Sequence, residues 1–158
     1  MSHIPDPDGP ALANLGFQVS RATANLPQTT SEALFTITGG RVLVSMLLGL
    51  VTTTIQAQAN NTKLVFNPDG AGLQTTDISA VLDITSDPAG IAYAMPATSG
   101  NAMSFSHGRI LQNNIPSTPG AIFAEGTINL NCAASNTGQV AWDIWYMALD
   151  QGATIVAA

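Results

Sequence analysis

The stretch RVLVSMLLGLVTTTIQAQANNTKLVF, residues 41–66, constrains the fold more than any other part of the chain. Residues 42–51 are apolar except for Ser45 and Gly49, and this run is about half of the roughly 20 residues that a membrane-spanning helix needs. The residues that follow alternate between two parities, a period of two that is typical of a strand with one solvated face. The sequence therefore predicts a strand over residues 41–59, continuous or bent near Gly49, and no membrane span.

Similar alternation recurs along the chain, and glycine, proline, asparagine and aspartate punctuate the runs as turn residues do. The predicted fold class is all-β: an antiparallel β-sandwich of jelly-roll type with an extended N-terminal arm. An immunoglobulin-like sandwich is the alternative, although its paired cysteines are missing. Besides 41–59, strands are expected over residues 31–38, 62–66, 77–85, 89–95, 102–111, 121–132 and 138–149. The inward parity predicts a core of Phe35, Ile37, Leu43, Ile55, Leu64, Leu82, Ile84, Ile128, Leu130, Trp142 and Ile144.

The N-terminal residues differ in composition from the rest of the chain. Residues 1–30 contain four prolines, and proline has no N–H group for a sheet ladder. We expect an extended arm over residues 1–30 and a β-sandwich (jelly-roll) domain over residues 31–158. Because the arm also carries large apolar side chains, we expect it to become ordered by packing against a neighbouring chain.

The charge pattern excludes several classes of partner. The net charge is −6 and only 9% of the residues are charged, against about 25% in an ordinary soluble domain. The four basic residues stand singly, so no cluster is available to displace phosphate counterions or to hold an anionic membrane. We therefore expect no direct binding of nucleic acid or membrane. Neutral polar residues must form the polar surface, which suits a protein covered by its neighbours in an assembly.

The residues that could carry chemistry lack the partners that chemistry needs. His107 has only His3 as a second histidine, so a histidine metal site is not expected. Cys132 is the single cysteine, so it cannot form an intrachain disulfide. Its apolar neighbours predict a position in the core. A chain with one cysteine also suggests synthesis in a reducing cytoplasm. The DPDG and NPDG segments are typical of turns. We expect no enzyme activity, no catalytic residue, no metal and no cofactor, and the N-terminus lacks the features of a signal peptide.

Three aromatic residues stand close together in the segment 138–149. Trp142 and Tyr146 share a parity with valine and isoleucine and are expected in the core, whereas Trp145 points the other way. An outward tryptophan is typical of an interface anchor, and it also fits stacking on a sugar in a carbohydrate-binding module. The apolar residues expected to form interfaces, in the arm, on the outer side of the strand at 42–51 and at the outward tryptophan, are Leu12, Leu15, Phe17, Val19, Val42, Val44, Met46, Leu48 and Trp145.

The segments LFTITGGRVLVSMLLGLVTTTIQAQANNTKLVF and GTINLNCAASNTGQVAWDIWYMALDQGATIVAA resemble small structural proteins of tailed bacteriophages, in particular capsid decoration (cement) proteins. The resemblance covers most of residues 31–158 and lies in their general texture, the DIWY strand and the apolar ATIVAA ending. It implies a structural virion protein on the capsid exterior, made in the host cytoplasm. Such proteins form oligomers, most often trimers or dimers, and clamp neighbouring major capsid protein subunits, often through an N-terminal arm. A homotrimer is the expected state here, and the alternative function is a carbohydrate- or receptor-binding module of a phage fibre or tail.

Overall fold

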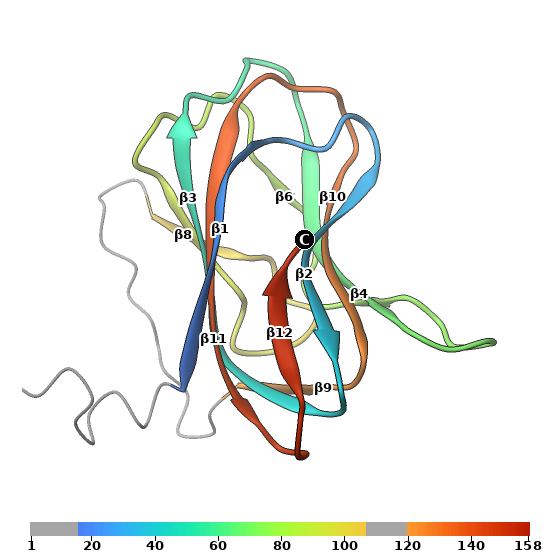
Figure 1. Cartoon of the computed structure of the whole chain (residues 1–158). Coiled ribbons are helices and arrows are strands. Elements are labelled where there is room, and N and C mark those ends of the chain that lie inside the picture. The colour runs from blue at the N-terminus through green and yellow to red at the C-terminus, as the bar shows by residue number, and fades with distance from the viewer. Residues whose placement is uncertain (1–15, 107–119) are drawn as a thin grey trace, which may run out of the picture.

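Two antiparallel sheets form the protein in the computed structural model, which describes residues 16–106 and 120–158 (Figure 1). Sheet A contains β1 (Phe17–Asn25), β3 (Val42–Thr53), β7 (Ala92–Ala94), β8 (Ser104–Ser106), β9 (Ala121–Phe123) and β11 (Gln139–Ala148). Sheet B contains β2 (Ser31–Thr38), β4 (Asn61–Pro68), β5 (Thr76–Asp77), β6 (Leu82–Asp83), β10 (Gly126–Cys132) and β12 (Thr154–Ala157). The described residues contain no helix, which confirms the prediction of an all-β antiparallel sandwich. Its assignment to the jelly-roll type stays a prediction.

The long strands β3, β10 and β11 lie inside the sheets. Sheet A has the order β1-β11-β3-β7-β8, with β9 also paired to β3, and sheet B has the order β12-β2-β10-β4-β5, with β6 also paired to β4. Alternating burial along β10, and along β11 as far as Met147, shows that one face of each strand meets the core. The two sheets pack these inward faces together, as in other sandwiches.

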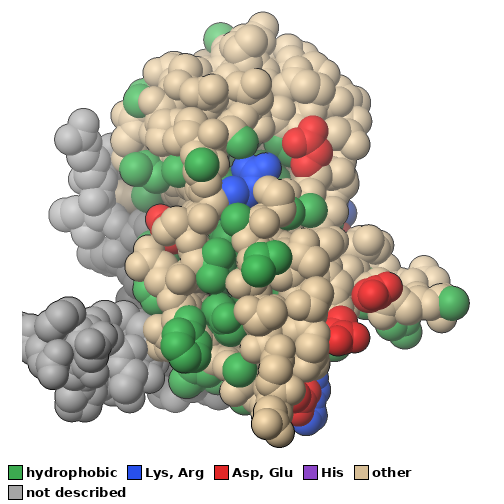
Figure 2. All heavy atoms as spheres, viewed as in Figure 1, with side chains coloured by type: hydrophobic (Ala, Val, Ile, Leu, Met, Phe, Trp, Pro, Cys, Tyr) green, Lys and Arg blue, Asp and Glu red, His purple; other side chains and the backbone are tan. Residues whose placement is uncertain are grey.

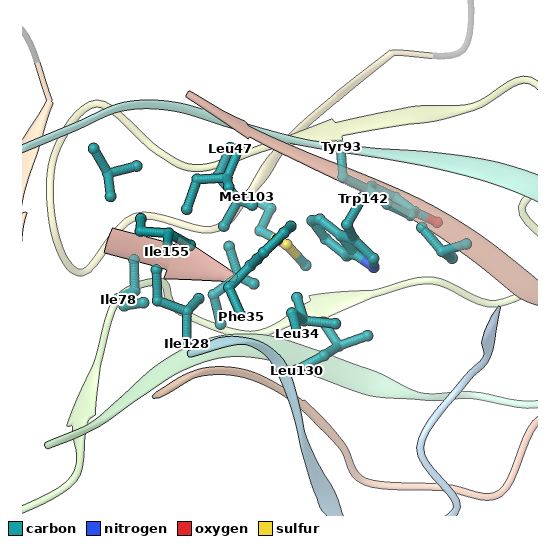
Figure 3. Packing of buried hydrophobic residues seen from close by; sticks show 14 of the residues in the cluster. Leu34, Phe35, Leu47, Ile78, Tyr93, Met103, Ile128, Leu130, Trp142 and Ile155 are labelled. Atoms are coloured by element: carbon teal, nitrogen blue, oxygen red, sulfur yellow. The ribbon is translucent and has the colours of Figure 1, made fainter. Parts of the chain in front are cut away.

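The core fills the space between the two sheets with large aliphatic and aromatic side chains (Figure 3). Trp142 from β11 and Phe35 from β2 are among the largest fully buried side chains. Apart from Leu43, the predicted core is confirmed: Phe35, Ile37, Ile55, Leu64, Ile84, Ile128, Leu130, Trp142 and Ile144 are buried, and Leu82 packs against them while remaining partly exposed.

Strand β3 carries a bulge that exchanges its two faces. The register with β11 pairs Val44 with Tyr146 and Met46 with Trp145, so β3 has one extra residue, Ser45, between these pairs. Such a bulge changes the side-chain parity along a strand. Before the bulge Val42 and Val44 point into the core, and both are fully buried. Their predicted place on an interface is therefore wrong.

Leu43 lies between those two valines and points outward, opposite Ile122 of β9. Its predicted place in the core is wrong for the same reason, because the sequence reading extended one parity through the whole of β3. The strand predicted over residues 41–59 corresponds to β3 and ends at Thr53.

Residues 17–25 belong to the sandwich. They form β1, which pairs with β11 in antiparallel register from Phe17 opposite Tyr146 to Asn25 opposite Gln139. Leu26 follows in the core, and its N–H donates to the carbonyl of Gly138 over 3.2 Å. The predicted arm over residues 1–30 is therefore wrong for this part. None of the four prolines lies within β1, so the strand keeps all its donors. Residues 1–15 lie outside the described residues.

The segment predicted as one strand over residues 121–132 divides between the two sheets. β9 pairs with β3 in sheet A, and β10 pairs with β2 and β4 in sheet B. Gly126 allows the change of direction, because its φ is +147°, and a Cβ there would lie 2.4 Å from the carbonyl oxygen of Asn67. A side chain could not occupy this position without displacing backbone.

Gly49 makes room for the largest side chain of the core. A Cβ on Gly49 would lie 2.8 Å from Cη2 and Cζ3 of Trp142, its cross-strand partner on β11. We expect Gly49→Ala to lower the free energy of unfolding by about 1–3 kcal/mol, since overpacking a filled core forces side chains out of place. Urea unfolding of Gly49→Ala, Trp142→Phe and the double variant measures this. The alanine should cost less beside the smaller phenylalanine ring; an equal cost in both backgrounds would contradict the steric explanation.

Candidate functional site: the outer face of sheet A

The outer face of sheet A is a large apolar surface on the described part of the molecule. We call it the apolar face and define it by the side chains of Leu43, Leu48, Leu50, Ile122, Trp145 and Met147. In β3 and β11 these residues alternate with, or lie next to, fully buried ones, so they point away from the core. Leu50 is 47% exposed and Ile122 is 65% exposed. Contiguous apolar surface of this kind marks a site of interaction.

The register of the strands brings these side chains together from three segments of the sequence. Leu43 of β3 lies between Ile122 of β9 and Met147 of β11. Farther along β3, Leu50 lies between Ala141 of β11 and Ala92 of β7. Leu48 and Leu50 of β3 therefore form a ridge. Leu48 lies between Asp143 and Ala94, and Leu50 has the short alanine side chains on both sides.

Polar side chains interrupt the apolar face on β11 and continue onto β1, because Asp143 of β11 lies opposite Leu48. Asp143 on β11 pairs with Ser20 on β1 and accepts a hydrogen bond from its hydroxyl over 2.5 Å. The side-chain amide of Gln18 donates to the same carboxylate oxygen over 3.2 Å. This arrangement anchors the edge strand to β11.

The predicted interface residues divide among several environments. Met46, Leu48 and Trp145 are partly exposed on the outer side of sheet A, where Met46 lies opposite Trp145. Phe17 and Val19 lie on the core side of β1: Phe17 is 69% exposed with its ring 5.9 Å from that of Tyr146, and Val19 packs against the core. Leu12 and Leu15 lie outside the described residues.

Sequence reasoning missed Ile122, Leu43 and Met147 as members of this surface. Leu50 shares the parity of Leu48 and ends the outer surface that the sequence predicted from Val42 to Leu50. Ile122 was hidden, because residues 121–132 read as a single strand and only the turn signal Glu125–Gly126 marks the break.

Within the described residues, the buried thiol and the buried phenol have structural roles. Burial raises the pKa of the Cys132 thiol, and this keeps the sulfur protonated and unreactive. Burial, and then the hydrogen bond from its hydroxyl to the Asp87 carboxylate over 2.5 Å, raise the pKa of Tyr93. Within residues 16–106 and 120–158, no group of three or more His, Cys, Asp or Glu side chains could hold a metal ion. His3 and His107 lie outside this part.

A small hollow opens at the edge of the sandwich between β1 and sheet B. Arg21, Glu32 and Trp142 contribute to its lining, and it has room for about one water molecule. The side-chain Nε–H of Arg21 donates to the carbonyl of the terminal residue Ala158 over 3.2 Å, which draws β1 toward β12. A hollow of this size cannot enclose an organic ligand.

Of the two acidic turn segments, only NPDG at residues 67–70 lies in the described part. Its Asp69 N–H donates to the carbonyl of Glu125 over 2.9 Å, and Gly70 has a φ of +138°. These features fit the turn that the sequence predicts. In Figure 2 the visible surface has few red or blue atoms, as the low charge content leads one to expect.

Comparison with protein-family models, with curated proteins and with solved structures finds no match for this chain. In residues 16–106 and 120–158 there is also no helix of the length and apolar character that crossing a membrane requires. The function is therefore inferred from the apolar side chains exposed on this face.

Proposed function

We propose that this chain is a structural virion protein that decorates a bacteriophage capsid and stabilises it by oligomerising and by binding the major capsid protein on the capsid exterior. One observation carries the proposal: the sandwich presents a wide apolar sheet face on a molecule with very little charge. Exposed apolar side chains gathered on one sheet face mark a site of interaction with another molecule. Its work is contact with other protein chains, which agrees with the resemblance of the sequence to decoration proteins.

The N-terminal residues supply a second point of contact in this proposal. The described chain begins at Gly16, where a Cβ would lie 2.9 Å from Cγ of Met147, at the edge of the apolar face. Fifteen residues precede it, and an extended segment of this length spans up to about 50 Å. This reach is enough for residues 1–15 to clamp a neighbouring capsid subunit, so the proposed arm is shorter than the one expected from the sequence.

Decoration of purified phage heads tests the proposed function. Heads that lack this protein are mixed with the full chain or with a truncation lacking residues 2–15, and bound copies are located by electron cryomicroscopy and counted after sedimentation. We expect the full chain to cover the head exterior in a regular array and to raise the temperature at which heads rupture. The truncation should bind more weakly and protect less.

Two outcomes contradict different parts of the proposal. If the full chain binds no head, or occurs only at the tail, the decoration function is wrong. If the truncation decorates heads as tightly as the full chain does, the clamp formed by residues 1–15 is wrong and the rest of the proposal stands.

Trp145 favours a second candidate function, a carbohydrate- or receptor-binding module of a fibre or tail. Its side chain lies on the outer side of a sheet, partly exposed, where a flat ring can stack on a sugar. Titration with host surface glycans, followed by tryptophan fluorescence, separates the two functions. Saturable quenching that disappears in Trp145→Ala would support glycan binding, and an unchanged spectrum would leave decoration as the better account.

A further inference from the structure

We infer that the apolar face is the contact between two copies of this chain, which stack their A sheets face to face across a two-fold axis. The inference deepens the proposed function, on which it rests, because it names the partner of this face and the symmetry of the assembly. It replaces the homotrimer expected from the sequence with a dimer as the unit of assembly.

The extent of the face matches what a stable dimer needs. β3 pairs with β11 from Val42 to Thr53, and β1 lies on one side of this pair, with β7 and β9 on the other. Ten residues of strand span about 33 Å and four strands about 19 Å, which gives roughly 600 Å² for each copy. Two such faces bury about 1,200 Å² in total, at the lower end of the range for specific protein interfaces.

The shape of the apolar face is complementary to a second copy of the same face. The ridge of leucines on β3 is flanked at Leu50 by Ala141 and Ala92, so there is a shallow groove on each side of that residue. A two-fold axis places the ridge of one copy against the groove of the other, and one surface then supplies both shapes. Sheets that stack face to face in this way lie about 10 Å apart, with side chains interdigitated.

The apolar face encloses the charged side chain of Asp143. The six residues that define the face carry no charge, but Asp143 lies opposite Leu48 within it and accepts hydrogen bonds from Ser20 and Gln18 of its own chain. A two-fold contact therefore brings in each carboxylate with hydrogen-bond donors already in place. Salt screens the repulsion between the net charges of −6 on the two copies.

Geometry favours a two-fold over a three-fold arrangement. A cyclic trimer joins two different patches of each subunit, whereas a two-fold dimer joins one patch to itself. A continuous sheet face can be covered by one copy of the same face. In a three-fold ring, a different surface of the neighbouring subunit would have to match its shape and apolar character.

The test measures the mass of the full chain in solution by sedimentation and by light scattering across a dilution series. We expect twice the mass of one chain for the wild type. Leu50→Lys and Ile122→Lys should each raise the dissociation constant at least about 100-fold, because a two-fold axis places each charge in the contact twice. Both positions are well exposed in the single chain, so both variants should fold. Leu73→Lys is the matched control, because Leu73 is 59% exposed on the β4–β5 loop, which extends away from the sandwich on the sheet B side (Figure 1).

Tryptophan fluorescence gives a second readout in the wild-type protein. Trp142 is buried in the single chain, whereas Trp145 is partly exposed and becomes buried only on association. Quenching by acrylamide should therefore increase on dilution in the wild type and remain high at every concentration in Ile122→Lys.

Four results would overturn the inference: a monomer at every concentration, a trimer, equal loss of mass in Leu73→Lys, or a dimer that forms only after residues 2–15 are removed. The last would show that the chain's own N-terminal segment covers the face. A monomer that still decorates heads would refute this inference alone, and a dimer that binds no heads would refute only the proposed function.

Discussion

Replacing Trp142 with alanine is expected to lower the free energy of unfolding by about 3–5 kcal/mol. The Trp142 ring is 2% exposed and lies in the core between the two sheets (Figure 3). Gly49 fits closely against the ring on the neighbouring strand, so the surrounding atoms are arranged around this one side chain. Its removal leaves a cavity that the rigid sheet cannot close, and the lost contacts add to the cost of transfer.

Trp145→Ala is the matched control, because the same residue type is removed from the same strand on the opposite face. Both substitutions are made in the Leu50→Lys background, in which the apolar face should not associate, and unfolding in urea is followed by circular dichroism. The loss from Trp145→Ala should be below about 1 kcal/mol. Equal losses at the two positions would mean that the assignment of inner and outer faces of β11 is wrong.

Removing residues 2–25 is expected to destabilise the protein by at least about 3 kcal/mol, since each lost cross-strand pair contributes roughly 0.2–1 kcal/mol and its hydrogen bonds add to this. The deletion removes β1 and uncovers one edge of β11, including the position beside Trp142 that Arg21 occupies. The newly exposed edge is also a template for aggregation. Val19, which packs against the core, is lost as well.

The comparison that tests this prediction is between the truncations lacking residues 2–15 and 2–25. The shorter truncation leaves every described strand intact, so its melting temperature should stay close to that of the full chain. The longer one should melt at a clearly lower temperature or be recovered as insoluble protein. If both truncations melt like the full chain, β1 contributes nothing to the stability of the sandwich. The assignment of residues 17–25 to the sandwich would then be wrong.

These two stability experiments also separate a loss of binding from a loss of folding in the variants used to test head decoration and association. A truncation that extends into β1 would weaken head binding simply because the sandwich is damaged. The boundary at Gly16 separates the proposed clamp from the fold, and only the shorter truncation reports on the clamp. In the same way, Leu50→Lys and Ile122→Lys change exposed positions, so a loss of association in these variants reports on the apolar face rather than on the core.

The sequence by itself determined the class of fold and most of the core. Along β10 and β11 the alternation is unbroken, so Ile128, Leu130, Trp142 and Ile144 could be assigned inward from the period of two alone. The same alternation placed Trp145 on the outer face. The low charge and the single cysteine follow directly from composition.

Only the tertiary structure decided which face the valines and leucines of β3 occupy. Residues 42–51 are apolar on both parities, so their pattern carries no preference, and the bulge at Ser45 is visible only in the pairing with β11. The apolar face could therefore be foreseen at Leu48 and Trp145 but not at Leu43 or Ile122. Likewise β1 reads as part of an arm until its partner, more than a hundred residues later in the chain, is known. Strand pairing between such distant segments is set by the packing of the whole sandwich, and a local pattern cannot encode it.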